Sequence, residues 1–210
     1  MNDVIEQIRA VSRSVGSEQL EVGSARTITL AQHFDAPVDR VWQTCTTLEE
    51  IPRWFLPIAG DLELDGRYQL EGNAGGRILT CDPPHGFTAG WQYGNDDSTI
   101  EVTFTEDSGG TLVQLVHAAE IDEDLWTRYG PGAGGIGWDM TFLGLATYLR
   151  TGRPVSPAES ARWARSNDGR QFVAVSSDAW REASVASGTP KKAARQAADR
   201  ATIAYTTIEE

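Results

Sequence analysis

The amino-acid sequence predicts an α+β fold: a curved antiparallel sheet of about six or seven strands around one long helix, with a helical C-terminal extension. Three observations predict it. The hydrophobic period changes from two to about 3.6 across Asp35-Ala36-Pro37. Short alternating segments separated by tight turns follow from residue 58 to residue 117. An apolar stripe at helical spacing then runs through about residues 137–149.

The first 24 residues predict an amphipathic helix of their own. Apolar side chains recur there at helical spacing, at Val4, Ile5, Ile8, Val11 and Val15. We expect this helix to end at Gly16 or Gly23, before the main domain of residues 25–150.

A strand and two short helices open the main domain. Residues 28–34 alternate, so Ile28, Leu30, Gln32 and Phe34 are expected on one face, with His33 on the other. Residues 38–45 then carry a helical pattern. Thr47 and Glu50 have the spacing of a capping box, which predicts a second short helix through residues 51–54.

Residues 61–117 predict an antiparallel meander. Residues 61–64 and 67–70 flank Asp65-Gly66, a strong hairpin signal. Four further alternating or apolar segments are separated by turn residues, at 77–81, 87–93, 99–105 and 111–117.

The long helix is predicted from Trp138, Phe142, Leu145 and Leu149, which recur on one helical face. This stripe is expected to lie across the concave face of the sheet. The glycine-rich residues 130–137 before it have neither of the glycine spacings that bind nucleotides, so we interpret them as a flexible lead-in.

Residues 151–210 contain only helical signals. Ser156, Pro157 and Glu159 form a capping box with proline at the first helical position. Two short helical segments are expected at residues 172–175 and 180–186. A last helix opens at Pro190 and presents a face of small residues suited to close helix packing.

Composition excludes several classes of protein. A net charge of −12 argues against nucleic-acid binding, and no apolar run is long enough to span a membrane. No signal peptide is recognisable, and Cys45 and Cys81 suit a reducing compartment, so a cytoplasmic location is expected. Residues 1–150 hold 9 basic against 23 acidic residues, whereas residues 151–210 hold 9 against 7. The C-terminal helices are therefore expected either to cover the acidic main domain or to form a homodimer.

The order of these features resembles the helix-grip superfamily called SRPBCC or START-like. Within it, the chain is similar to the family named after the activator of the Hsp90 ATPase. The resemblance rests on Asp35-Ala36-Pro37, Val41-Trp42, the hairpin at Asp65-Gly66-Arg67-Tyr68, the Pro83-Pro84 turn and Gly137-Trp138. It continues through Gly75-Gly76 with Ile78, Trp91, Thr111, Leu115 and His117, and covers about residues 25–150.

The resemblance implies a cavity between the sheet and the long helix that binds a small hydrophobic or amphipathic molecule. The candidate ligand-binding residues are Trp54, Phe55, Trp91, Tyr93, His117, Trp126, Tyr129 and Trp138. Core packing is the competing interpretation for each aromatic residue among them.

Two other functions share the same fold and stay open. A cyclase or hydrolase would use His117 or a tyrosine as acid and base. A chaperone-associated interaction module, suggested by the family name, would need an exposed apolar patch. No metal-ligand spacing or cofactor motif is present, so neither a metal nor a cofactor is expected.

Overall fold

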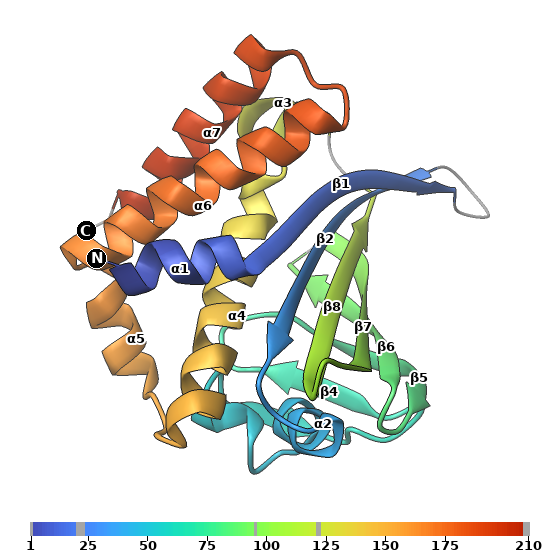
Figure 1. Ribbon diagram of the computed structural model, residues 1–210. Helices are drawn as coiled ribbons and strands as arrows, with labels where there is room; N and C mark the ends of the chain where they lie inside the picture. The colour runs from blue at the N-terminus through green and yellow to red at the C-terminus, as the bar shows by residue number, and fades with distance from the viewer. Residues whose placement is uncertain (1, 20–23, 95, 121–122, 208–210) are drawn as a thin grey trace.

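The computed structural model describes residues 2–19, 24–94, 96–120 and 123–207 (Figure 1). Its strands form one antiparallel sheet in the order β1-β2-β8-β7-β6-β5-β4-β3. The strands are β1 (Val11–Gln19), β2 (Ser24–Phe34), β3 (Ile58–Gly60), β4 (Arg67–Leu70), β5 (Gly75–Asp82), β6 (Gly86–Tyr93), β7 (Asp96–Asp107) and β8 (Gly110–Ala119). The α+β prediction is confirmed, with eight strands in the described part of the chain rather than six or seven.

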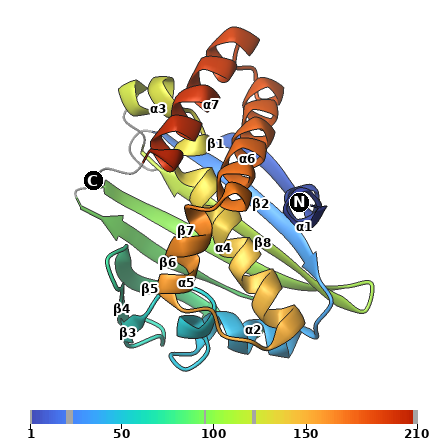
Figure 2. The ribbon, with the colours of Figure 1, turned by 90° about the vertical axis from the view of Figure 1, so that its left-hand side faces the viewer.

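The helices lie on one side of this sheet. They are α1 (Asn2–Ala10), α2 (Val38–Thr46), the 3-10 turn η1 (Ile51–Arg53), α3 (Glu123–Tyr129), α4 (Gly132–Thr151), α5 (Pro157–Ala164), α6 (Asn167–Ala186) and α7 (Lys191–Thr206). Figure 2 shows α4 running diagonally across the sheet, with α6 and α7 at one end of it. Among the described residues, no helix is long and apolar enough to cross a membrane.

The sheet face that meets α4 carries the main core. Strand side chains alternate between the two faces, so Leu30, Phe104 and Val113 are buried between the sheet and α4. His33 is only half-buried between the buried Gln32 and Phe34, as expected for the opposite face.

The N-terminal helix is shorter than predicted. It ends at Ala10, and residues 11–19 form β1, which pairs with β2 along its whole length from Val11 opposite Gln32. The prediction of a helix through these residues was wrong because Val11 and Val15 are four residues apart, a spacing that fits both periods. Gly23, the alternative helix end, lies outside the described residues.

Two local predictions between β2 and β4 were also wrong. The hydroxyl of Thr47 donates to the carbonyl of Gln43, so Thr47 ends α2 and does not cap the next turn. The strand expected at residues 61–64 lies instead at β3, which pairs with β4. Residues 61–66 connect the two strands, and Asp65 in this connection has a φ of 69°.

The glycine-rich lead-in belongs to α4 itself, which begins at Gly132 rather than near Gly137. The prediction of a flexible lead-in was wrong because residues 132–137 are helical, and two glycines of α4, one of them in this segment, meet other elements at close range. A Cβ at Gly135 would lie 2.3 Å from the Trp180 ring, and one at Gly144 would lie 2.6 Å from the carbonyl oxygen of Trp54. Trp138, Phe142 and Leu145 are buried, as the stripe predicted.

The C-terminal extension packs on the main domain. The Ser156–Glu159 capping box is present at α5. The two short segments expected at residues 172–186 form one continuous helix, α6, which Ser166 caps. Helix α6 packs against α1, β1, α4 and α7, and Ala194, Ala197, Ala198 and Ala201 of α7 are buried. Dimerisation through these helices stays a prediction, which the molecular mass in solution would test.

Candidate ligand-binding site

A cavity of about 360 Å³, here called the inner cavity, lies between the sheet and α4. Strands β4 to β8 supply its floor and α4 its roof, while α2 and residues 51–62 close one side. Its lining is Trp42, Cys45, Thr46, Thr47, Ile51, Trp54, Phe55, Ile58, Leu62, Tyr68, Leu70, Ile78, Cys81, Phe87, Ala89, Trp91, Ile100, Val102, Val113, Leu115, Trp138, Thr141, Phe142 and Leu145.

The inner cavity is uncharged. None of the described residues that line it is Asp, Glu, Lys, Arg or His. Burial raises the pKa of the Tyr68 hydroxyl to about 12, and this hydroxyl donates to the carbonyl of Gly90. Burial likewise raises the pKa of the Cys45 thiol to about 12. Both groups are neutral at physiological pH, so the cavity offers apolar contacts and no ionic partner.

A second cavity of about 460 Å³, the outer cavity, lies toward α3 and α7. It shares Phe55, Trp91, Trp138 and Thr141 with the lining of the inner cavity. The rest of its lining is more polar and includes Arg26, Tyr93, Asp96, Asp97, Ser98, His117, Glu120, Trp126 and Tyr205. The guanidinium of Arg26 pairs with Glu123 at 2.9 Å and lies 4.8 Å from the centre of the Trp126 ring. The two cavities therefore adjoin but differ in polarity.

His117 on β8 stands between strand and helix at this boundary. Its Nδ1 accepts a hydrogen bond from the indole Nε1 of Trp138 at 3.1 Å. Its Nε2 lies 2.8 Å from the Ser98 hydroxyl oxygen, and that hydroxyl donates to the carbonyl of Trp91 at 2.6 Å. Burial lowers the pKa of His117 to about 4. The imidazole is therefore neutral near pH 7.

The low pKa of His117 predicts a loss of stability in mild acid. Between pH 6.5, the ordinary pKa, and about pH 4, the unfolded chain binds a proton that the folded chain does not. The free energy of unfolding therefore falls as the pH falls through this window, and the loss from pH 7 to pH 5 is about 2 kcal/mol. Urea unfolding at pH 7 and pH 5, for the wild type and for His117→Gln, measures this loss of stability. Equal pH dependence in the two proteins would contradict the prediction.

The structure distributes the sequence-predicted residues over both cavities. Trp54 lines the inner cavity, while Phe55, Trp91 and Trp138 line both. Tyr93, His117 and Trp126 line the outer cavity only. Tyr129 lines neither, and its ring lies 5.0 Å from the guanidinium carbon of Arg128.

Several lining residues were not among the candidates. Trp42, Tyr68 and Phe87 belong to the inner cavity. The helical stripe of α2 and the alternation in β4 and β6 carried a signal for them, because these patterns place all three on inward faces. No residue type distinguished them from ordinary core positions.

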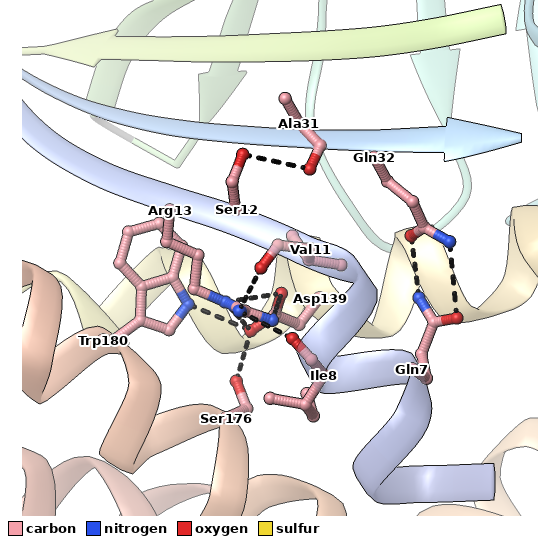
Figure 3. Close-up of polar contacts among 10 residues, drawn as sticks. All are labelled: Gln7, Ile8, Val11, Ser12, Arg13, Ala31, Gln32, Asp139, Ser176 and Trp180. Atoms are coloured by element: carbon pink, nitrogen blue, oxygen red, sulfur yellow. Dashed lines mark hydrogen bonds and ion pairs between the residues drawn. The ribbon is translucent and has the colours of Figure 1, made fainter. Parts of the chain in front are cut away.

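A buried ion pair that no sequence motif predicted fixes the far side of α4 (Figure 3). Asp139 is fully buried on α4, and Arg13 of β1 pairs with it at 2.8 Å. Ser176 and the indole of Trp180, both on α6, also donate to Asp139. Four groups from three elements thus hold α4 in place over the inner cavity. Among the described residues, no group of three or more His, Cys, Asp or Glu could hold a metal ion.

Comparisons with known proteins agree with this architecture. A sequence model of the family described as activator of Hsp90 ATPase homolog 1-like protein matches residues 35–150. The solution structure of CalU16 from Micromonospora echinospora is 34% identical over 86% of this chain and 97% of its own, with a TM-score of 0.69. Its crystal structure has the same identity over 80% and 98%, with a TM-score of 0.59. No curated protein matches the chain.

One more distant structure shares the fold alone. PFC0360w, an HSP90 activator from Plasmodium falciparum, is 20% identical over 61% of this chain and 97% of its own, with a TM-score of 0.50. The antiparallel sheet around a long helix is thus common to proteins with very different sequences.

Proposed function

We propose that the inner cavity of this protein binds one small, uncharged hydrophobic molecule. The chain belongs to the activator of Hsp90 ATPase homolog 1-like family. The observation that carries the proposal is the lining of that cavity, which is mainly apolar and aromatic and, among the described residues, free of charged side chains. A charged ligand would lose its hydration there without gaining a partner.

Size and chemistry support the same conclusion. A cavity of about 360 Å³ lies within the range of small-molecule sites. Burial of roughly 200 Å² of apolar ligand surface would contribute about 5 kcal/mol before the entropic cost of association. The aromatic rings of Trp42, Trp54, Phe87 and Phe142 favour a ligand with an aromatic or otherwise flat apolar body.

Paired compounds test this proposal. Each pair shares one aromatic skeleton, with a methyl group in one compound and a carboxylate in the other, as in 2-methylnaphthalene and 2-naphthoate. The neutral compound should raise the midpoint of thermal unfolding, because it binds the folded chain alone and stabilises it by about 2.7 kcal/mol at a concentration of 100 times Kd. Equal shifts from both compounds, or no shift from any neutral compound, would contradict the proposal.

Filling the cavity should abolish binding. Ala89 is buried on β6 and lines the inner cavity, so the ring in Ala89→Phe should occupy the space that the ligand needs. Loss of at least tenfold in affinity, measured by titration with a neutral aromatic compound, is the expected result. Thr88→Phe is the matched control, because its side chain points to the opposite face of the same strand. Tight binding by Ala89→Phe would place the ligand elsewhere.

The enzyme alternative finds less support in the geometry. Both ring nitrogens of His117 are engaged in hydrogen bonds, so taking up a proton would break the contact with Trp138. The Tyr68 hydroxyl is likewise bound to a backbone carbonyl. Neither group is placed to act as an acid or base without rearrangement.

A further inference from the structure

The wall between the inner and outer cavities is built largely by two tryptophans. Trp91 of β6 and Trp138 of α4 line both cavities, and their ring centres are 4.8 Å apart. Phe55 and Thr141 complete the residues common to both linings. The orientation of these two rings therefore decides whether the cavities are separate or continuous.

A directed series of hydrogen bonds fixes the Trp138 indole and connects it to the backbone of Trp91. The indole N–H of Trp138 can only donate, so Nδ1 of His117 must accept. The Ser98 hydroxyl gives its proton to the Trp91 carbonyl, which leaves its oxygen to accept from Nε2–H of His117. Every proton in the chain from Trp138 to Trp91 is thereby assigned. His117 links the helix to the strand that carries the other tryptophan.

This series of hydrogen bonds passes through His117, a buried histidine whose two ring nitrogens are both engaged. Burial keeps His117 neutral, and a neutral imidazole with its proton on Nε2 offers the acceptor and the donor that the two neighbours require. The ring of His117 also meets those of Trp91 and Trp138 edge-on, with centres 6.4 and 5.7 Å away. Loss of the imidazole would leave the Trp138 N–H without its acceptor and remove the contact that turns the indole toward Trp91.

We propose that His117 is a positioning residue that sets the upper size limit of the ligand by holding the Trp91–Trp138 wall closed. This inference rests on the proposed function of the inner cavity. With the wall closed, the ligand cannot extend from the inner cavity into the outer one. With the wall open, a longer molecule extends into the additional 460 Å³ of the outer cavity.

A homologous series of ligands tests the size limit. The 4-alkylphenols from ethyl to nonyl are uncharged at pH 7 and differ by one methylene each. Affinity should rise about fourfold per methylene buried, at about 0.8 kcal/mol each, until the ligand fills the inner cavity. Beyond that length the affinity of the wild type should stop rising. Isothermal titration gives the dissociation constant of each member.

Three variants separate the role of His117 from a general effect on folding. The break is the alkyl-chain length at which affinity stops rising. His117→Leu should move this break to longer alkyl chains and raise the ratio of long-chain to short-chain affinity at least tenfold. His117→Gln supplies an amide acceptor and donor, so it should keep the break of the wild type. Ser98→Ala, which cuts the link to Trp91, should behave like His117→Leu and serves if that variant does not fold.

The outcomes distinguish this inference from the proposed function. A break at the same chain length in His117→Leu or Ser98→Ala as in the wild type would overturn the size limit while leaving the inner cavity as the site. A shifted break in His117→Gln would overturn the role of the hydrogen bonds. A general structural role would lower the affinity for all chain lengths together, which would also overturn it. No binding by any member to the wild type would contradict the proposed function itself.

Discussion

Replacing Arg13 with methionine (Arg13→Met) is expected to lower the free energy of unfolding by about 3–5 kcal/mol. The guanidinium donates through Nε and Nη2 to the fully buried carboxylate of Asp139. Its Nη1 donates to the carbonyls of Ile8 and Val11, where α1 joins β1. The variant therefore leaves a buried carboxylate without its counter-charge and two carbonyls without this donor.

The control is an ion pair of similar length at the surface. Arg77 pairs with Asp65 at 2.9 Å, but half or more of both side chains is exposed. Arg77→Met should cost no more than about 1 kcal/mol. Urea unfolding at pH 7 measures both variants, and the double variant Arg13→Met with Asp139→Asn should recover part of the loss because the orphaned charge is gone. A loss in Arg13→Met no larger than in Arg77→Met would contradict the account of the buried pair.

Gly135→Ala is expected to lower the free energy of unfolding by about 1–3 kcal/mol, although alanine is the better helix former. A Cβ at this position would lie 2.3 Å from the Trp180 ring. That ring is almost fully buried, and its N–H donates to Asp139, so it cannot yield without breaking the network around Arg13. Helix α6 would have to move away from α4.

Gly134 provides the neighbouring control within the same helix. A Cβ there would meet nothing nearer than 3.6 Å, an ordinary contact with Ile28. Gly134→Ala should therefore leave stability unchanged or raise it by up to about 1 kcal/mol. Chemical denaturation of the two variants gives the comparison. Similar changes in both would show that the contact with Trp180 does not require glycine.

The parts of the fold that the sequence predicted are those with an unambiguous local period. The alternating strands and the stripe of Trp138, Phe142 and Leu145 identified the sheet and the long helix. The pattern of Val11 and Val15 was ambiguous, so β1 was mistaken for helix. The ion pair between Arg13 and Asp139 joins residues 126 apart in sequence, and neither residue belonged to a motif. Such pairs depend on the assembled fold.

Several aromatic residues proposed from the sequence line the two cavities, while their role in ligand binding stays a prediction. Aromatic residues near the end of the meander and the start of the long helix lie around the two cavities, as the positions of Trp91 and Trp138 show. The sequence did not predict two adjoining cavities, nor the hydrogen bonds of His117 to Ser98 and Trp138 at their boundary. The register between β7 and β8 brings His117 close to Ser98. It places His117 opposite Ile100, and Ser98 lies two residues before Ile100 on the same face of β7.

Native mass spectrometry tests the central claim most directly. Wild-type protein and Ala89→Phe are each incubated with an equimolar mixture of neutral aromatic compounds and their carboxylate analogues, and the bound masses are compared. The account predicts one neutral compound bound per wild-type chain and none bound to Ala89→Phe. Bound carboxylates, or the same bound masses in both proteins, would contradict a neutral ligand in the inner cavity.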